Sequence, residues 1–210
     1  MTGPDYQLER AAIAGNTGPV AGVDEVGRGP LAGPVTAAAV ILDPGNIPEG
    51  LNDSKKLTAA RRTTLHDSLM AVAEVSVAHA TVEEIDRLNI LRASHLAMAR
   101  AVAGLVRAPG FVLVDGNMIP RDMAVPARAV IKGDGVSLSI AAASIVAKTR
   151  RDRLMRDLAQ QFPGYGWETN AGYPSKSHRA ALLNLGVTPH HRRSFKPVHN
   201  ILYQEKSISP

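Results

Sequence analysis

The segment Val23-Asp24-Glu25-Val26-Gly27-Arg28-Gly29-Pro30 places two adjacent carboxylates directly before a glycine-rich turn that contains one arginine. Carboxylate oxygens are the ligands by which proteins hold hard divalent cations. A Gly-Arg-Gly turn exposes backbone N–H groups and a planar cation, and both suit phosphate or sugar oxygens. The segment is also compatible with an ordinary solvated loop. As a functional segment, it predicts a place where a metal ion and a nucleic-acid backbone are held together.

Strands are predicted on both sides of this turn and again further along the chain. The flanking stretches are apolar and rich in β-branched residues, and two later apolar runs each end at a carboxylate or a glycine-rich turn. A weaker alternation of valines after the first predicted helix indicates one more strand. The predicted strands cover residues 20–25, 35–42, 72–77, 111–114 and 129–131.

Helices are predicted from capping residues and from apolar positions at helical spacing. Thr58 and Thr81 each precede such a segment, and Thr81 with Glu84 forms a capping box. Strands and helices mixed in this order predict an α/β sheet with helices on its faces. The predicted helices cover residues 58–70, a start at 81, 90 to about 109, 137–161, and a last helix that ends at Gly186.

The composition is that of an ordinary globular protein of one domain, with 210 residues, 45% hydrophobic and 20% charged. A net charge of +5 and a pI near 9.7 favour a polyanionic partner. Aromatic residues are only 4%, which argues against a binder built on stacked bases. The absence of cysteine excludes disulfides and thiolate metal sites. A polar N-terminus and the lack of a long apolar run predict a cytoplasmic protein without a membrane segment.

Four acids, Asp24, Glu25, Asp115 and Asp134, lie at or just past the ends of predicted strands, where open α/β sheets form their sites. Together they would repel one another, so their convergence requires a divalent cation, with Mg²⁺ or Mn²⁺ as the expected cofactor. Two such ions support in-line phosphoryl displacement by water. Because neighbouring residues on a strand face opposite sides, Asp24 and Glu25 share a site only if the strand ends or bends at these two residues, which the nearby Gly27 favours.

Several motifs, in order along nearly the whole chain, closely resemble bacterial ribonuclease HII. Each is modest alone, and the set is specific. They are residues 22–35, 52–57, 114–117, 132–134, 142–148 with Arg151-Asp152, 172–174 and 190–195.

This resemblance implies a ribonuclease H-like fold, a five-stranded mixed sheet flanked by helices, with a C-terminal helical extension. Residues 1–160 would be the catalytic domain, and residues 161–210 the extension and tail, packed as one unit with it. The implied enzyme cuts the RNA strand of RNA/DNA hybrids. It also incises 5′ of single ribonucleotides in duplex DNA, leaving 3′-hydroxyl and 5′-phosphate ends.

Site residues follow from the same resemblance. The four acids are the implied metal ligands and catalytic residues, Gly27, Arg28 and Gly29 form the substrate-recognising turn, and Tyr173 is the implied junction-sensing tyrosine. The 2′-hydroxyl is the sugar group that separates RNA from DNA, and the ring of Tyr173 would pack against the neighbouring deoxyribose.

Basic residues and histidines complete the expected site. We expect phosphate contacts or solvated charges at Lys55, Lys56, Lys148 and Arg151. Asp152 is expected to pair with Arg151 or an adjacent helical turn. His190 and His191 are expected at the surface or on phosphate rather than on a metal, and His95 in the core.

Two alternatives remain at this stage: a DNA resolvase of the same fold and a noncatalytic basic duplex-binding module. The four acids would suit a resolvase, but a resolvase would leave the Gly-Arg-Gly turn and Tyr173 without a role. In a duplex-binding module, the acids would repel phosphate and weaken DNA binding. A monomer is expected.

Overall fold

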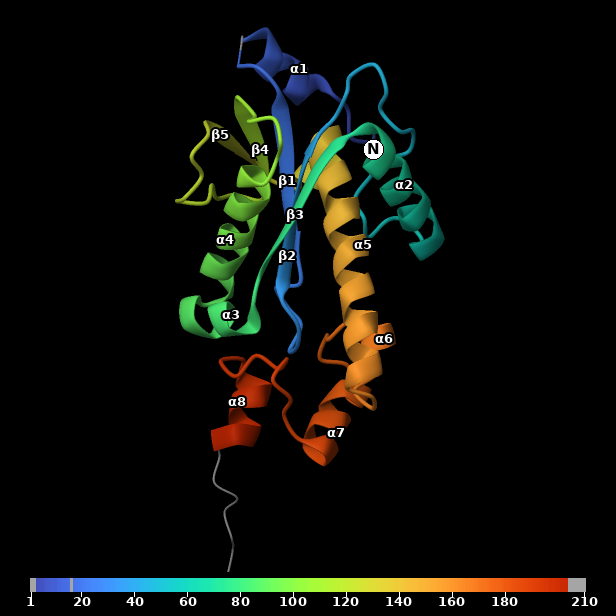
Figure 1. The fold of residues 1–210 in the computed structure, drawn as a ribbon, viewed down its shortest axis with the longest axis vertical. Coiled ribbons are helices and arrows are strands. Elements are labelled where there is room, and N and C mark those ends of the chain that lie inside the picture. Colours follow the sequence, from blue (N-terminus) through green and yellow to red (C-terminus); the bar gives the residue numbers. More distant parts are fainter. Residues whose placement is uncertain (1–2, 16, 204–210) are drawn as a thin grey trace, which may run out of the picture.

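The computed structural model describes residues 3–15 and 17–203, and a five-stranded sheet forms their centre (Figure 1). The strand order is β3-β2-β1-β4-β5. Strands β1 and β2 are antiparallel, as are β2 and β3, whereas β4 runs parallel to β1 and β5 runs parallel to β4. The predicted mixed sheet is confirmed. Its strands are β1 (Val20–Val26), β2 (Val35–Ile41), β3 (Glu74–Ala80), β4 (Phe111–Asp115) and β5 (Ala127–Val130).

Helices cover both faces of the sheet because β2 is apolar on both sides. Ala37 and Ala39 of β2 pack in a cluster with α4 (Ile90–Ala103), whereas Ala38 and Val40 pack with α5 (Leu138–Gln161) and α2 (Ala59–Val72). All residues of β2 are buried, and a strand buried on both faces loses the polar alternation of a surface strand. The sheet is therefore the middle layer of three.

The predicted capping residues begin their helices as expected. The Thr58 hydroxyl accepts from the Arg61 N–H at the start of α2, and Thr81 with Glu84 forms both bonds of a capping box at α3 (Val82–Leu88). Ser137 caps α5 in the same way, accepting from the Ile140 N–H. Local side-chain chemistry thus sets these boundaries.

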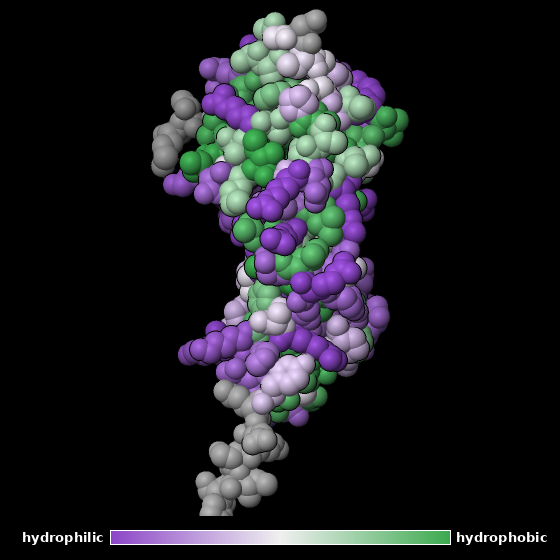
Figure 2. Space-filling view, turned by 90° about the vertical axis from the view of Figure 1, so that its left-hand side faces the viewer, coloured by the Kyte–Doolittle hydropathy of each residue, from purple (hydrophilic) through white to green (hydrophobic). Residues whose placement is uncertain are grey.

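Beyond α5 the chain forms a C-terminal extension at the lower end of the molecule (Figure 1). It contains α6 (Trp167–Asn170), α7 (Lys176–Leu185) and α8 (Lys196–Tyr203). These pack with the last turns of α5 in a cluster that includes Met155, Trp167, Leu182 and Val198. From the α4 side, hydrophilic side chains lie over much of the middle and lower parts of this face, next to hydrophobic ones (Figure 2).

Several predicted boundaries are wrong. α7 is not the last helix, since α8 follows it, and the predicted disorder of the final residues lies outside the described range. α4 ends at Ala103, at its cap Gly104, rather than near Pro109. Ile131 lies beyond β5 and is exposed.

A short helix, α1 (Gln7–Ala14), was not predicted. The buried Glu9 carboxylate accepts from the Ser137 hydroxyl at 2.6 Å and from the Ser139 N–H at 2.9 Å, so α1 is held by the start of α5, far away in the sequence. Tertiary contact, not local propensity, fixes this helix. No helix of the described residues has the length and hydropathy needed to traverse a bilayer.

Candidate active site

The parallel pairing of β1 and β4 brings two of the predicted acids to the same edge of the sheet. Val23 pairs with Val114, so Asp24 and Asp115 follow at equivalent positions of neighbouring strands. Equivalent positions on parallel strands face the same side. Asp24 pairs with Ala38 of β2, whose side chain belongs to the α5 face. Asp24 and Asp115 therefore lie together on the α5 face.

The strand does not end at Asp24 and Glu25, and that part of the expectation is wrong. β1 continues to Val26, and Glu25 pairs with Ala37 on the α4 face, opposite Asp24. What ends is the neighbouring strand, because the pairing of β1 with β4 stops at Val23 and Val114. Beyond this point β1 is no longer paired with β4, and the charge of Asp115 acts on both Asp24 and Glu25.

Asp134 reaches the same edge through a tight turn after β5. It lies in the 3₁₀ turn η1 (Gly133–Gly135), which follows Lys132 in the left-handed region with φ 54°. The Gly133 N–H donates to Asp115 Oδ1 at 2.7 Å. This bond ties the turn that holds Asp134 to the end of β4, so all four predicted acids meet at one edge.

The acids raise one another's pKa. Burial raises the pKa of Asp24 well above its usual value, and the charges of Glu25 and Asp115 raise it further. Burial raises the pKa of Glu25 against the opposing charge of Arg28, which lies 3.4 Å away. Burial and then Asp115 raise the pKa of Asp134. Carboxylates that resist ionisation together need a cation to offset their charge.

This donor set suits a hard divalent ion, since its ligands are carboxylate oxygens only. Within residues 3–15 and 17–203, no three His, Asp or Glu side chains are close enough to form a ready-made cage. The nearest oxygens have local partners: Asp24 Oδ1 accepts from the Glu25 N–H at 2.7 Å, and Asp115 Oδ1 accepts from Gly133. Ion binding would therefore require the carboxylates to turn inward.

A fifth acid, Asp53, was not predicted to belong to the site. Its charge raises the pKa of Asp134, and the charge of Lys55 lowers it, so the loop at residues 52–56 borders the acids. Ser54 anchors this loop by accepting from the Ser144 hydroxyl of α5 at 2.8 Å. Lys55 and Lys56 are exposed beside the acids. The motif Asn52-Asp53-Ser54-Lys55-Lys56 identifies the loop in the sequence, but it does not indicate that Asp53 lies close enough to Asp134 to raise its pKa.

The Gly-Arg-Gly turn lies next to the acids and to Tyr173. Arg28 links the turn to Glu25 by the ion pair at 3.4 Å. Gly27 has φ +97°, and a Cβ there would overlap the side chain of Arg151. A Cβ on Gly29 would lie 3.4 Å from the ring of Tyr173, so the ring packs directly against the turn. The predicted recognition residues are thus brought together.

Arg151 is not a surface phosphate contact, and that prediction is wrong. It is fully buried, and its guanidinium donates to the carbonyls of Ala32 and Pro34 at 3.0 Å and Ala171 at 2.9 Å. Arg192, which sequence reasoning missed, is buried in the same way and donates to carbonyls of the turn. Arg192 lies in the motif at residues 190–195, but no local sequence pattern indicates that an arginine will be buried.

The expectation of a surface-exposed His191 is also wrong. His191 and His178 are fully buried, with their Nε2 atoms 3.1 Å apart. His178 Nδ1 donates to the Tyr173 carbonyl, and its Nε2 accepts from Trp167 Nε1. His191 Nδ1 accepts from the Thr188 N–H, so its Nε2 holds the proton shared with His178. This network fixes the backbone of Tyr173. His190, by contrast, is half-buried.

A groove of about 350 Å³ adjoins the acids on the α4 face. Glu25, Arg28 and Asp115 line it together with Ser94 and His95 of α4. His95 is half-buried rather than a core residue, and burial and the charge of Arg28 lower its pKa. The groove makes the acids accessible from this side.

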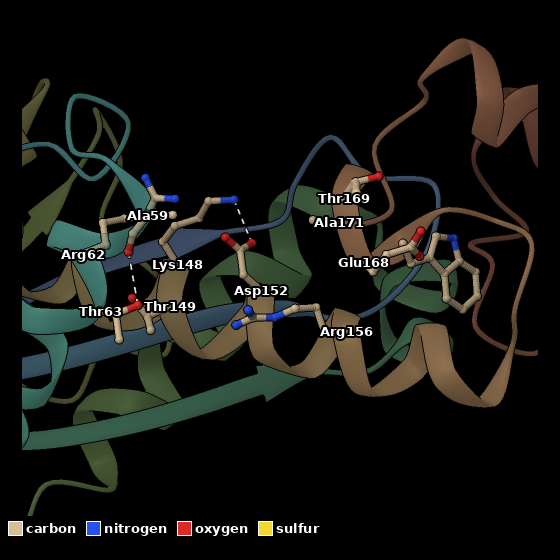
Figure 3. A pocket seen from close by; sticks show the side chains of 11 residues that line it. Ala59, Arg62, Thr63, Lys148, Thr149, Asp152, Arg156, Glu168, Thr169 and Ala171 are labelled. Atoms are coloured by element: carbon tan, nitrogen blue, oxygen red, sulfur yellow. Dashed lines mark hydrogen bonds and ion pairs between the residues drawn. The ribbon is translucent and has the colours of Figure 1, made fainter.

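On the α5 side, a cleft of about 330 Å³ lies between α2, α5 and α6 (Figure 3). Lys148 points into it and pairs with Asp152, one helical turn later, at 2.8 Å. This is one of the two pairings considered for Asp152. Arg62 at the same cleft donates to the carbonyls of Ser54 and Leu57, which holds the lysine loop against α2. Phosphate contact by Lys55, Lys56 and Lys148 stays a prediction.

Comparison with known proteins supports one family. The family model of ribonuclease HII matches residues 21–198. A ribonuclease HII of Ruegeria pomeroyi is 76% identical over 205 residues, which are 98% of this chain and 88% of that protein.

Solved structures agree in fold. The crystal structure of ribonuclease H2 from Pyrococcus horikoshii has a TM-score of 0.73 and 29% identity, covering 88% of this chain and 97% of that one. The structure of Bst-RNase HIII in complex with Mn²⁺ also has a TM-score of 0.73, at 19% identity, covering 90% and 71%, which supports the fold alone. The chain belongs to the ribonuclease HII family, metal-dependent endoribonucleases that act on RNA/DNA hybrids.

Proposed function

We propose that this protein also incises duplex DNA on the 5′ side of a single embedded ribonucleotide, leaving 3′-hydroxyl and 5′-phosphate ends. The observation that supports this most directly is the contact of Tyr173 with the Gly27–Gly29 turn, beside the acids. A turn that only had to bind a continuous hybrid would not need a ring against it. Ring and turn together offer a way to distinguish the sugar on each side of one phosphate.

Asp24, Glu25, Asp115 and Asp134 are the residues that would hold the divalent cation, either Mg²⁺ or Mn²⁺. When bound, the cation would offset their charge, polarise the phosphodiester and increase the acidity of a water molecule. Burial and neighbouring negative charges raise the pKa of Asp24, Glu25 and Asp134, so a bound ion would be needed to keep these carboxylates ionised together. The coupled acids thus supply the electrostatic reason for a metal requirement.

Substrate recognition would fall to the turn and to Tyr173. Arg28 and Gly29 are exposed, and the backbone can approach a ribose closely where no side chain intervenes. The ring of Tyr173 is 40% exposed and would pack on the neighbouring deoxyribose, where a second hydroxyl would collide with it. Lys55, Lys56 and Lys148 would contact phosphates around this centre.

The extension would act with the sheet domain as a single unit in a monomer. The end of α5 shares a hydrophobic cluster with Trp167 and Leu182 of the extension, and Arg192 bonds the turn after β1. The boundary near residue 160 would therefore separate two parts of the sequence, whereas the two parts would work as one functional unit. Because its proposed substrate is duplex DNA, we place the protein in the cytoplasm.

The test uses two labelled duplexes of identical sequence, one all DNA and one with a single ribonucleotide, in Mg²⁺, Mn²⁺ or EDTA. We expect one cut, 5′ of the ribonucleotide, with either metal, and none in EDTA or in the all-DNA duplex. Cutting of both duplexes at similar rates would indicate a DNA nuclease of the same fold. Cutting of hybrids without cutting of the single-ribonucleotide duplex would reject the proposed incision.

A further inference from the structure

Two fully buried arginines lie under the Gly27–Gly29 turn. Arg151 comes from α5, and Arg192 from the segment between α7 and α8. Within the described part of the chain, neither forms an ion pair with a carboxylate, and both guanidiniums donate to backbone carbonyls instead. Arg192 bonds the carbonyls of Gly27 at 2.6 Å, Arg28 at 3.1 Å, Gly33 at 2.9 Å and Pro34 at 3.2 Å.

This arrangement is costly, which makes its geometry informative. A buried cation without a carboxylate must recover its lost hydration from neutral oxygens. Burial lowers the pKa of Arg192 to about 9, and the nearby charge of Arg151 contributes to the decrease. Burial likewise lowers the pKa of Arg151 to about 10. A hydrophobic residue of similar volume would fill the space at lower cost, but it would not orient the carbonyls of the turn.

The carbonyls that Arg192 bonds determine where the N–H groups of the turn point. In a trans peptide the C=O and the N–H point in opposite directions, and the described residues contain no cis peptide. Because the carbonyls of Gly27 and Arg28 point inward at Arg192, the N–H groups of Arg28 and Gly29 point away from it. These two N–H groups have no hydrogen-bond partner among residues 3–15 and 17–203, and both residues are exposed.

Successive N–H groups that project from a turn with one positive φ form a concave site for an electronegative oxygen. We propose that Arg192, supported by Arg151, is the positioning residue for ribose recognition, because it turns the Arg28 and Gly29 N–H groups toward the sugar oxygens of the substrate. This inference rests on the proposed function, since it assigns how the turn of that same site is set.

The second arginine extends this effect to Tyr173. Arg151 Nη1 donates to the Ala171 carbonyl at 2.9 Å, and its Nη2 donates to the Ala32 carbonyl at 3.0 Å. The Leu31 N–H donates to the Gly172 carbonyl at 2.8 Å, so the two segments are also joined directly. Arg151 therefore fixes the distance between the turn and the ring that packs on Gly29.

The experiment measures selectivity for one 2′-hydroxyl, separately from cutting. In an Asp134→Asn background, dissociation constants are measured for a duplex with one ribonucleotide and for the matched all-DNA duplex. Selectivity is the dissociation constant of the all-DNA duplex divided by that of the ribonucleotide duplex. We expect Arg192→Lys and Arg192→Gln to lower this ratio by about tenfold or more. Affinity for the all-DNA duplex should change by less than about threefold, because phosphate contacts remain. Lys should retain more selectivity than Gln, since it keeps the charge and some donors.

Two controls separate positioning from general loosening. Arg193→Lys alters an exposed neighbour and should leave both constants unchanged. Leu182→Ala destabilises the hydrophobic cluster of the extension and should weaken the binding of both duplexes by the same factor. If Gln at position 192 prevents folding, the Lys variant retains cation and stem and gives the same readout.

The outcomes are distinguishable. If the Asp134→Asn parent shows no preference for the ribonucleotide duplex, the proposed function fails. If the parent shows the preference and the folded Arg192 variants keep it, only the role of Arg192 is overturned. The same holds if the Arg192 variants lose affinity for both duplexes equally, as Leu182→Ala is expected to do.

Discussion

The acid cluster and the recognition turn lie side by side, but their internal interactions differ. In the acid cluster, burial and the charge of Asp115 raise the pKa of Asp24 and of Asp134, so the arrangement is unfavourable without a cation. The turn at residues 27–29 is the opposite case, because buried Arg192 bonds the carbonyls of Gly27 and Arg28, while Arg151 bonds the carbonyls of Ala32 and Pro34 that follow the turn. The acid cluster needs a cation to offset its charge, whereas the turn is held by Arg192 before any ligand binds.

This difference indicates a division of labour. A site with mutual repulsion can respond to an ion, because binding relieves the repulsion. A turn whose Gly27 and Arg28 carbonyls are held by a buried guanidinium can discriminate between sugars, since a fixed donor set cannot adapt to the wrong one. Substitutions in the first region should therefore change chemistry more than stability, whereas substitutions in the second should change stability and selectivity together.

The largest effect is expected for Asp115→Asn. Asparagine can still accept from the Gly133 N–H, so the turn with Asp134 stays in place while one metal-binding charge is lost. We expect the rate of incision to fall by more than about 100-fold, beyond what loss of an outer ligand partner costs. Melting in EDTA should not decrease, because a repulsive charge is removed. An active variant, or one that unfolds, would contradict the assignment.

Gly27→Ala and Gly29→Ala form a matched pair in the second region. Alanine at 27 must adopt φ +97° and would overlap Arg151, so we expect a stability loss of about 1–3 kcal/mol from the backbone alone. At 29 the added Cβ would meet only the Tyr173 ring, at 3.4 Å, so stability should change by less than about 0.5 kcal/mol while selectivity decreases. Urea unfolding and the two-duplex assay give the values. Equal stability losses would show that the turn is not held as described.

Tyr173→Ala should have a moderate effect. Because the ring would pack on a deoxyribose during cutting, we expect about a tenfold lower rate at a lone ribonucleotide, equivalent to about 1.4 kcal/mol. Binding should change less than cutting, and Tyr173→Phe should behave like the parent because it retains the ring. An equal loss in binding and rate for Tyr173→Ala would mean that the ring only anchors the substrate.

A last effect concerns acid and changes the stability of the fold rather than cutting. Burial lowers the pKa of His191 from its ordinary value of 6.5 to about 3. Below pH 6.5 the His191 imidazole binds a proton in the unfolded chain but not in the folded chain. The stability that the neutral, buried His191 contributes above pH 6.5 is therefore lost gradually as the pH falls toward 3. The single tryptophan, Trp167, bonds His178 and reports unfolding of this region.

Urea midpoints followed by tryptophan fluorescence between pH 7.5 and 5 test this expectation. His191→Gln can replace both hydrogen bonds without titrating, so its midpoint should depend less on pH. His199→Gln, at an exposed position, is the control. A slope unchanged by His191→Gln would assign the acid sensitivity to other groups.

Much of the first region could be predicted from the sequence. Apolar strands that end at carboxylates are local patterns, and Asp115 and Asp134 are recognisable from the residues directly before them. The fold's five strands follow from the same patterns, as do helix starts with a capping residue. α1 could not be found, because Glu9 stabilises it through Ser137 and Ser139, far away in the sequence.

The second region could be predicted only in part. The turn and Tyr173 were recognisable as motifs, but the burial of Arg151 was not. A basic residue on a helix is usually solvated, so the sequence predicts a phosphate contact or a solvated charge for Arg151, and both differ from its burial. Arg151 and His191 become buried only when the extension packs on the turn after β1, and that packing depends on residues more than 100 positions apart.

The central claim is that the acid cluster is completed by a divalent cation, and thermal melting with Mn²⁺ tests it most directly. At 100 times its dissociation constant, an ion that binds only the folded state adds about 2.7 kcal/mol. We expect Mn²⁺ to raise the melting temperature of the parent and of the exposed-acid control Asp157→Asn, but not of Asp115→Asn. An equal shift in all three proteins, or no shift in the parent at millimolar Mn²⁺, would contradict the account.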